Sequence, residues 1–264
     1  MARDLLNSVP DWALEAIFIA GTVIITFAVL GLVHRFLPAW RESGSGDKVV
    51  GVAAMVMTLF ALVLAFVVVN LNNSYETVSS NVNGEASSLA EVVLDARVFP
   101  ARAEHAVDLS VARYVQEVVR HEFAELRHGR EDPEAQRRYY AMFGALQSYS
   151  PVTRAQATFY NSAVAQLGAV VTERRDRLDA AETTIPSPLV GLMILLAVMT
   201  LVTTIFVKTN HAGIDLVLVF SVAVVVGAGL LTAAILEYPF SGSIAVSSKP
   251  YERGVLAQVT SRYH

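Results

Sequence analysis

Cysteine is absent from this chain, and charged side chains are scarce. Without cysteine there is no disulfide, no thiolate chemistry and no cysteine-based metal site. Only 17% of the 264 residues are charged, against about a quarter in an average soluble domain. The net charge is only −4, and no cluster of lysine or arginine is of the kind that binds nucleic acid or anionic lipid. Nucleic acid is therefore not an expected partner, and neither is an anionic-lipid anchor.

The scarcity of charge is concentrated in four apolar runs, which are Ala13–Val33, Val49–Leu71, Leu189–Val207 and Leu216–Leu236. Each run is about 20 residues long, enough to cross a hydrocarbon core of about 30 Å. The pattern predicts an all-α membrane protein whose four transmembrane helices carry a helical bundle inserted between helices 2 and 3. The expected parts are a transmembrane hairpin (1–74), the bundle (75–185), a second hairpin (186–237) and an extramembrane tail (238–264).

Basic residues near the ends of the runs predict the orientation in the membrane. The short loops 34–48 and 208–215 hold His34, Arg35, Arg41, Lys48 and Lys208, and we expect them to be cytoplasmic. Both termini and the insert would then be extracytoplasmic, in a multi-pass protein of a bacterial plasma membrane. Arg174, Arg175 and Arg177, with Lys249 and Arg253, oppose this orientation, but long translocated segments largely escape the charge rule. The N-terminus lacks the basic cluster of a secretory signal, so the first run is expected to be retained.

The insert shows apolar residues at helical spacing in four segments. The first can continue the second span without a break and ends at Phe99-Pro100. The second carries Val107, Val111, Tyr114 and Val118 and closes near His128-Gly129. The third follows Asp132-Pro133, an expected N-cap and first helical residue, and carries Tyr139, Phe143 and Leu146. The fourth follows Ser150-Pro151 and carries Tyr160, Val164, Leu167, Val171 and Leu178. Four such helices would bury their apolar faces in a bundle.

Small side chains follow one face of the second span, at Gly51, Ala54, Thr58, Ala61 and Ala65. A small face lets helices approach closely in lipid, and the same face can line a pore because it leaves room. Asn70 extends this candidate pore-lining set, and Asn72 and Asn73 are candidate residues of the pore mouth, where amides can hydrogen-bond a dehydrating ion. The alternative for the three asparagines is that they cap the span or mark the membrane interface.

The third and fourth spans contain polar and small residues but no charge at their centres. Thr200, Thr203 and Thr204 can bond back to the helix backbone, and Gly227 with Gly229 allows a bend or a tight helix contact. A proton-coupled carrier normally places Asp, Glu or His at mid-depth, so the sequence argues against that class.

One histidine-containing group stands out in the insert. His121, Glu125 and His128 fall on one face of the second predicted helix, where they would bind Zn²⁺ or sense pH, or simply be solvated. No nucleophile, phosphate-binding or dinucleotide motif is present. The sequence therefore predicts no catalytic residue, no cofactor and no enzymatic activity.

The segment after the fourth span carries a recognisable motif, Pro239-Phe240-Ser241-Gly242, followed by Val246-Ser247 and Pro250-Tyr251. It resembles the closing motif of a bacterial family of unknown function called bestrophin-like. The resemblance covers about residues 45–256 and includes Leu64–Val69 followed by Tyr75, but Asn72-Asn73-Ser74-Tyr75 stands where the family commonly has Trp-Glu-Gln-Tyr. Bestrophins are four-span pentameric anion channels with a cytosolic helical insert. The resemblance thus implies a channel, but an orientation opposite to that predicted from the loop charges.

Two functions remain after these observations. The first is a homo-oligomeric ion channel or channel-like pore, a pentamer and anion-permeable by resemblance, with the lipid bilayer and inorganic ions as partners. The alternative is a membrane sensor or scaffold whose bundle binds a ligand or partner.

Overall fold

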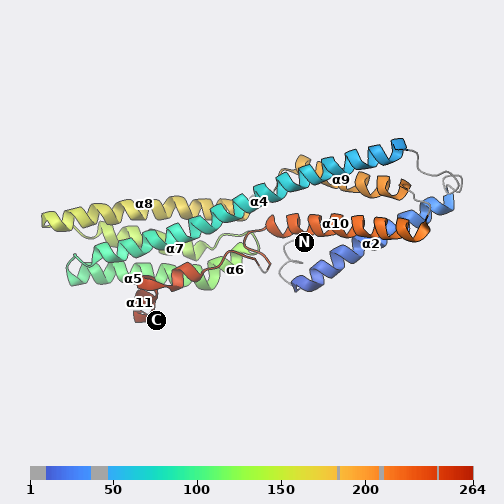
Figure 1. Ribbon diagram of the computed structural model, residues 1–264. Coiled ribbons are helices and arrows are strands. Elements are labelled where there is room, and N and C mark those ends of the chain that lie inside the picture. The colour runs from blue at the N-terminus through green and yellow to red at the C-terminus, as the bar shows by residue number, and fades with distance from the viewer. Residues whose placement is uncertain (1–9, 37–46, 183–184, 208–210, 243, 264) are drawn as a thin grey trace. The chain divides into compact units, whose positions relative to one another are not determined.

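A computed structural model describes residues 10–36, 47–182, 185–207, 211–242 and 244–263. The chain forms two compact units. The membrane unit comprises residues 1–73 and 184–238, and the insert unit comprises residues 74–183 and 239–264. One unbroken helix, α4 (Asp47–Ala96), contributes its first half to the membrane unit and its second half to the insert unit (Figure 1). The predicted continuation of the second span into the insert is confirmed.

The membrane unit contains the four predicted spans. They are α2 (Asp11–Phe36), the first half of α4, α9 (Ser187–Phe206) and α10 (Ala212–Leu236). Among the described residues, these are the helices that are long and apolar enough to cross a membrane. Pro188 lies in the first turn of α9, where its missing N–H would have no intrahelical partner in any case. Of the loop charges used to predict the orientation, Arg41, Lys208 and the His34 side chain lie outside the described residues.

Contacts within the membrane unit depend on small residues in α10. A Cβ on Gly227 would lie 3.0 Å from Thr22 Oγ1 and 3.4 Å from the Ile19 Cα of α2. A Cβ on Gly229 would lie 2.5 Å from Leu64 Cδ2 of α4. The two glycines therefore serve tight helix contacts on two sides of α10, the second of the two roles considered from sequence.

The insert unit is a helical bundle. After α4 come α5 (Ala101–Glu117), a π-helical turn η1 (Val118–Glu122), α6 (Phe123–Leu126), α7 (Pro133–Gln147) and α8 (Arg154–Glu182). Asp132 caps α7 by accepting a hydrogen bond from Glu134 N at 2.9 Å, and Pro133 is the first helical residue. Both roles were predicted from sequence. Gly129 has φ +69° in the turn that ends the second predicted helix.

The apolar core of the insert unit is continuous from α4 through α8. The predicted stripes contribute to it, and in the fourth stripe Leu167 and Leu178 are buried and Tyr160 and Val171 pack against the core. Val164 is 42% exposed, so its predicted burial is wrong. The buried line of α8 runs through Ala163, Leu167 and Val170 and continues into Arg174 and Arg177, because these positions recur at three- and four-residue steps.

The segment after α10 is part of the insert core. It contains a short 3₁₀ helix, η2 (Lys249–Glu252), and α11 (Gly254–Arg262), which packs on α5. Phe240 and Tyr251 are buried, and both rings meet Phe123 edge-on at centroid distances of 6.0 Å. The C-terminal tail is therefore bound to the insert by aromatic packing.

Candidate functional site

The first candidate site is the small-residue face of α4. Gly51, Ala54, Thr58, Ala61 and Ala65 are all exposed in the protomer, whereas Ala53, Phe60 and Val67 on the other side of the helix are buried. Phe60 and Val67 pack against α9 and α10. The small face therefore does not pack against the other described spans of this chain.

The three asparagines do not share one face. Asn70, Asn72 and Asn73 all lie on α4 and are exposed. At about 100° per residue, Asn72 falls within about 20° of Ala65, whereas Asn70 is turned about 140° away. The small-residue line therefore continues to Asn72, and Asn70 belongs to a different side of the helix.

Hydroxyl groups in the spans are mostly bonded to their own helices. Thr58 Oγ1 donates to Ala54 O at 2.8 Å, Thr203 Oγ1 to Met199 O at 2.8 Å and Thr204 Oγ1 to Thr200 O at 2.7 Å. Back-bonding of this kind satisfies a hydroxyl in an apolar environment. Each hydroxyl oxygen can still accept a hydrogen bond, but each hydroxyl proton is already donated to the helix backbone.

His121 and Glu125, two members of the predicted group with His128, bond to different partners. His121 Nδ1 lies 2.6 Å from Glu117 Oε1, and Glu125 accepts a hydrogen bond from Arg130 Nε at 2.7 Å. The π turn ends at Glu122, so the regular four-residue spacing between His121 and Glu125 is interrupted. In the described part of the chain, no group of three or more His, Cys, Asp or Glu residues is placed to hold a metal ion.

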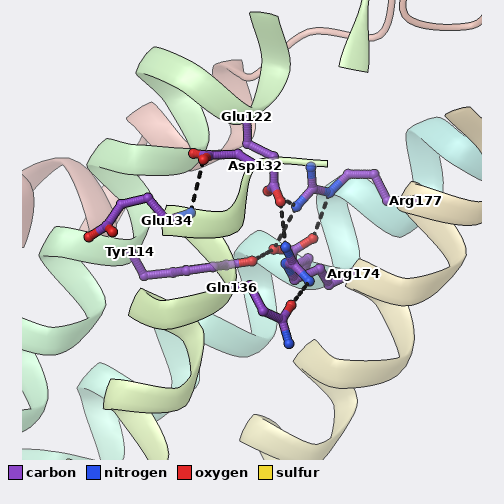
Figure 2. A network of polar contacts seen from close by, with 8 residues as sticks. Tyr114, Glu122, Asp132, Glu134, Gln136, Arg174 and Arg177 are labelled. Atoms are coloured by element: carbon purple, nitrogen blue, oxygen red, sulfur yellow. Dashed lines mark hydrogen bonds and ion pairs between the residues drawn. The ribbon is translucent and has the colours of Figure 1, made fainter. Parts of the chain in front are cut away.

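The second candidate site is a buried ionic network in the insert unit, drawn in Figure 2. Arg177 of α8 donates from Nε to Glu85 Oε2 at 2.9 Å and from Nη2 to Glu122 Oε2 at 2.7 Å. The side chains of all three residues are fully buried. Because Glu85 lies on α4 and Glu122 on the π turn, one guanidinium connects three elements.

Two further side chains extend this network. Arg174 donates to Glu122 Oε1 and to Gln136 Oε1 of α7, both at 2.5 Å. Tyr114 of α5 donates its hydroxyl to Glu85 Oε1 at 2.5 Å. Two guanidiniums thus face two carboxylates, and every main helix of the insert supplies a member of the network.

The carboxylates of the network stabilise the charged form of Arg177 and the protonated form of Tyr114. Burial would lower the pKa of Arg177, but the carboxylates of Glu85 and Glu122 outweigh it and raise the pKa well above its usual value. Burial and the same carboxylates raise the pKa of Tyr114 far above 10.0, so its hydroxyl stays protonated and donates. In the network each carboxylate is paired with a guanidinium, an arrangement that holds helices together.

The C-terminal motif reaches this network. Tyr251 is fully buried, and burial together with the nearby Glu85 carboxylate raises its pKa well above 10.0. Its hydroxyl makes no well-formed hydrogen bond to any described residue. Ser241 Oγ donates to Arg127 O at 3.0 Å, and Gly242 takes φ +78°, a conformation that favours glycine. The motif Pro239–Gly242 is therefore a turn that directs the tail into the insert core.

Sequence reasoning did not identify the network as a site. It placed Tyr114 in an apolar stripe and used Arg174 and Arg177 only as charges near a span. The signal that was missed is the position of the charged residues on the apolar faces of their helices. Glu85 follows Val78 and Val82 at helical spacing, and Arg174 follows Leu167 and Val170 in the same way. A charged residue that falls on an apolar stripe must find a partner.

Comparison with known proteins gives both a family and a fold. A family model described as a bestrophin-like domain matches residues 20–251. Two crystal structures of single-substitution variants of a bacterial bestrophin homolog from Klebsiella pneumoniae are similar, with TM-scores of 0.70 and 0.66 at 11% and 13% identity. A crystal structure described as that of a membrane protein variant has a TM-score of 0.68 at 10% identity. Each similarity covers 94% of this chain and 97% of the other.

No curated protein matches the chain in sequence. At identities this low the structural likeness establishes the fold alone.

Proposed function

The chain belongs to the bestrophin-like family, and from this premise we propose that it is a homo-oligomeric, anion-permeable channel or channel-like pore in a bacterial plasma membrane. We do not propose an enzymatic activity. The observation that carries the proposal is the small face of α4, which is exposed in the protomer over Gly51–Ala65. A small face left open on a membrane helix is suited to assembly or to a pore.

Two features favour a pore over a carrier. Four spans are few for a monomeric transporter, and the spans have no ionisable residue at mid-depth. The continuous α4 supports the same conclusion, because one helix of 50 residues, about 75 Å long, contains both the proposed pore-lining face and the first helix of the insert. The small face and Asn72 lie along one side of that helix.

The test is the conductance of the purified protein in planar bilayers, with phenylalanine placed on the small face. Ala54→Phe, Thr58→Phe and Ala65→Phe should each reduce unitary conductance severalfold. Leu59→Phe is the matched control, since Leu59 is an exposed large residue on a different side of the same helix. Absence of any conductance would refute the pore. If Leu59→Phe reduced the conductance and the three substitutions on the small face did not, the pore would be lined by the other face of α4.

The orientation is part of the proposal. The loop charges favour an extracytoplasmic insert and termini, whereas the family resemblance implies a cytosolic insert. We retain the orientation from the charges, because it follows from residues of this chain.

A sensor or scaffold is the second candidate function. The observation that favours it is a polar cavity within the insert unit.

A further inference from the structure

One line of small side chains on the outside of α8 is open to packing. Ala165, Gly168, Thr172 and Asp176 follow one another at three- and four-residue steps, so they share one side of the helix, and all four are exposed. A Cβ added to Gly168 would meet nothing within 4 Å. Small side chains leave a shallow surface on which the ridge of another helix can pack.

Carboxylates border this line on the side toward α4. Ser88 of α4 donates to Glu173 Oε2 at 3.3 Å, so Glu173 lies at the seam between the two helices. Glu91, three residues after Ser88, is exposed on the same side of α4. Burial, and after it the charges of Glu85 and Asp176, raise the pKa of Glu173, which is the direction expected where negative charge gathers. The acidic face of α8 is defined here as Ala165, Gly168, Thr172 and Asp176 with the bordering Glu173 and Glu91.

The outside of α5 carries charge of the opposite sign. Arg102, Ala106, Leu109 and Arg113 also recur at three- and four-residue steps and form one line, which we call the basic face of α5. Its two arginines are exposed, and the two apolar residues between them are half-buried. Among the described residues, neither arginine forms an ion pair, and neither does Asp176 of the acidic face. These charges are therefore available to a partner.

The two faces lie at the same height on opposite sides of the insert unit. In Figure 1, α8 runs along one edge of the insert and α5 along the other. Tyr114 of α5 and Arg177 of α8 both bond to Glu85. Arg113 and Asp176 directly precede these two residues, so they share one level along the bundle.

The two helices also run in the same direction. Phe99, two residues before α5, packs against Tyr160 in the second turn of α8, with ring centroids 6.4 Å apart, so both helices begin at the same end of the insert. Rotation of a copy about an axis parallel to these helices brings its basic face to the acidic face of the next copy at an unchanged level. A contact between two different surfaces is heterologous, and it forms a ring when the rotation closes.

We propose that the acidic face of α8 in one copy of this chain docks on the basic face of α5 in the next copy, with Asp176 opposite Arg113. The inference rests on the proposed homo-oligomer and names its contact in the insert unit. Opposite charges decide which faces meet and in which register, and the small residues of α8 receive the apolar residues of α5.

The first test is cross-linking of introduced cysteines, because the chain has none of its own. The full-length double variant Ala106→Cys with Thr172→Cys, in bacterial membranes, is treated with a short bis-maleimide. We expect a series of covalent dimers, trimers and larger products, since each copy presents one thiol to each neighbour. Each single-cysteine variant should stay monomeric. A covalent dimer of either single variant would indicate contact between identical faces and would overturn the proposal.

Charge reversal tests the complementarity in the same double-cysteine background. Asp176→Arg with Glu91→Arg should reduce the cross-linked fraction about tenfold, because like charges then meet. Arg102→Glu with Arg113→Glu should reduce it to a similar extent. The chain with all four reversals should recover the cross-linking, because opposite charges meet again, and this recovery also shows that the substitutions permit folding.

Two exposed residues outside both faces supply sign-matched controls. Glu131→Arg lies before α7, and Arg175→Glu is turned about 100° from Asp176 on α8. Both should leave the cross-linking unchanged.

The mass of the purified parent protein in detergent, measured by light scattering, separates two kinds of failure. An oligomer that gives no cross-links with the cysteine pair, or whose cross-links ignore both reversals, overturns the assigned faces but not the homo-oligomer. A monomeric parent overturns both.

Discussion

Arg177 on α8 donates two hydrogen bonds to Glu85 on α4, from Nε at 2.9 Å and from Nη2 at 3.3 Å. Both side chains are completely buried. A planar guanidinium that meets a carboxylate in this way fixes the rotation of each helix as well as their separation. Buried ion pairs are weak evidence for stability, because desolvation offsets the attraction. Removing only one partner of a buried ion pair is strongly destabilising, because the remaining charge stays buried without a counter-charge.

Arg177→Met should destabilise the protein by about 3–5 kcal/mol, because Glu85 and Glu122 would remain buried without their shared partner. The measurement is unfolding of the purified protein in detergent, followed by circular dichroism. Arg175→Met is the matched control on an exposed neighbouring position and should change stability by less than about 0.5 kcal/mol. Equal stability of both variants would show that the network does not hold the insert together.

Tyr114→Phe removes a single hydroxyl that donates to Glu85 at 2.5 Å. The expected loss is about 1.5–3 kcal/mol, the range for a hydrogen bond to a charged group. Tyr140→Phe is the control, since Tyr140 is 62% exposed on α7 and its hydroxyl can bond to water. The same unfolding assay applies, and a loss at Tyr140 as large as that at Tyr114 would contradict the prediction.

Glu173 should make stability depend on pH. Burial, and beyond it the charges of Glu85 and Asp176, raise its pKa above the ordinary 4.5, despite a hydrogen bond from Ser88. The folded protein therefore binds this proton more tightly than the unfolded chain does, so the contribution is present at pH values below about 4.5 and is lost as pH rises through the raised pKa. Glu173→Gln should stabilise the protein at neutral pH and leave it little changed in acid.

Thermal midpoints measured across a pH series would check this difference. Glu91→Gln, at an exposed site on α4, is the control and should shift the curve little at any pH. If the thermal midpoints of Glu173→Gln and of the parent protein differed by the same amount at every pH, the prediction would be contradicted.

Gly227→Ala should weaken the contact between α2 and α10. The added methyl would meet Thr22 Oγ1 at 3.0 Å and the Ile19 Cα at 3.4 Å, and backbone cannot rotate away as a side-chain end can. Overpacking of this kind costs about 1–3 kcal/mol. Gly21→Ala, where a Cβ meets nothing within 4 Å in the protomer, is the control. The detergent unfolding assay should separate the two variants, and equal stability would argue against a close contact.

The orientation predicts the activity of topology reporters. A periplasmic reporter such as alkaline phosphatase should be active when fused after His264 or inserted at Gly129, and a cytoplasmic reporter at the same positions should be silent. The reverse pattern would place the insert in the cytosol and would show that the arginines before α9 outweigh the short loops.

Much of the insert could be predicted because its signals are local. Asp132 and Pro133 specify a helix start by the hydrogen bonds that their own backbone and side chain can make. The absence of a breaking residue pair between Val49 and Ala96 allowed α4 to run on as one helix. Val164 was misplaced because α8 presents apolar residues on adjacent lines, and only packing against α4 and α7 selects one of them.

The amino-acid sequence by itself determined the number of long apolar helices and the presence of a helical insert, since apolar length and helical period act within each segment. Only the tertiary structure decided which side chains meet. It paired Glu85 with Arg177 across 92 positions of the chain, directed Gly227 and Gly229 to different neighbours, and returned Tyr251 to the insert core. These outcomes depend on how helices rotate against one another, and that rotation is set by packing and by the partners that buried charges require.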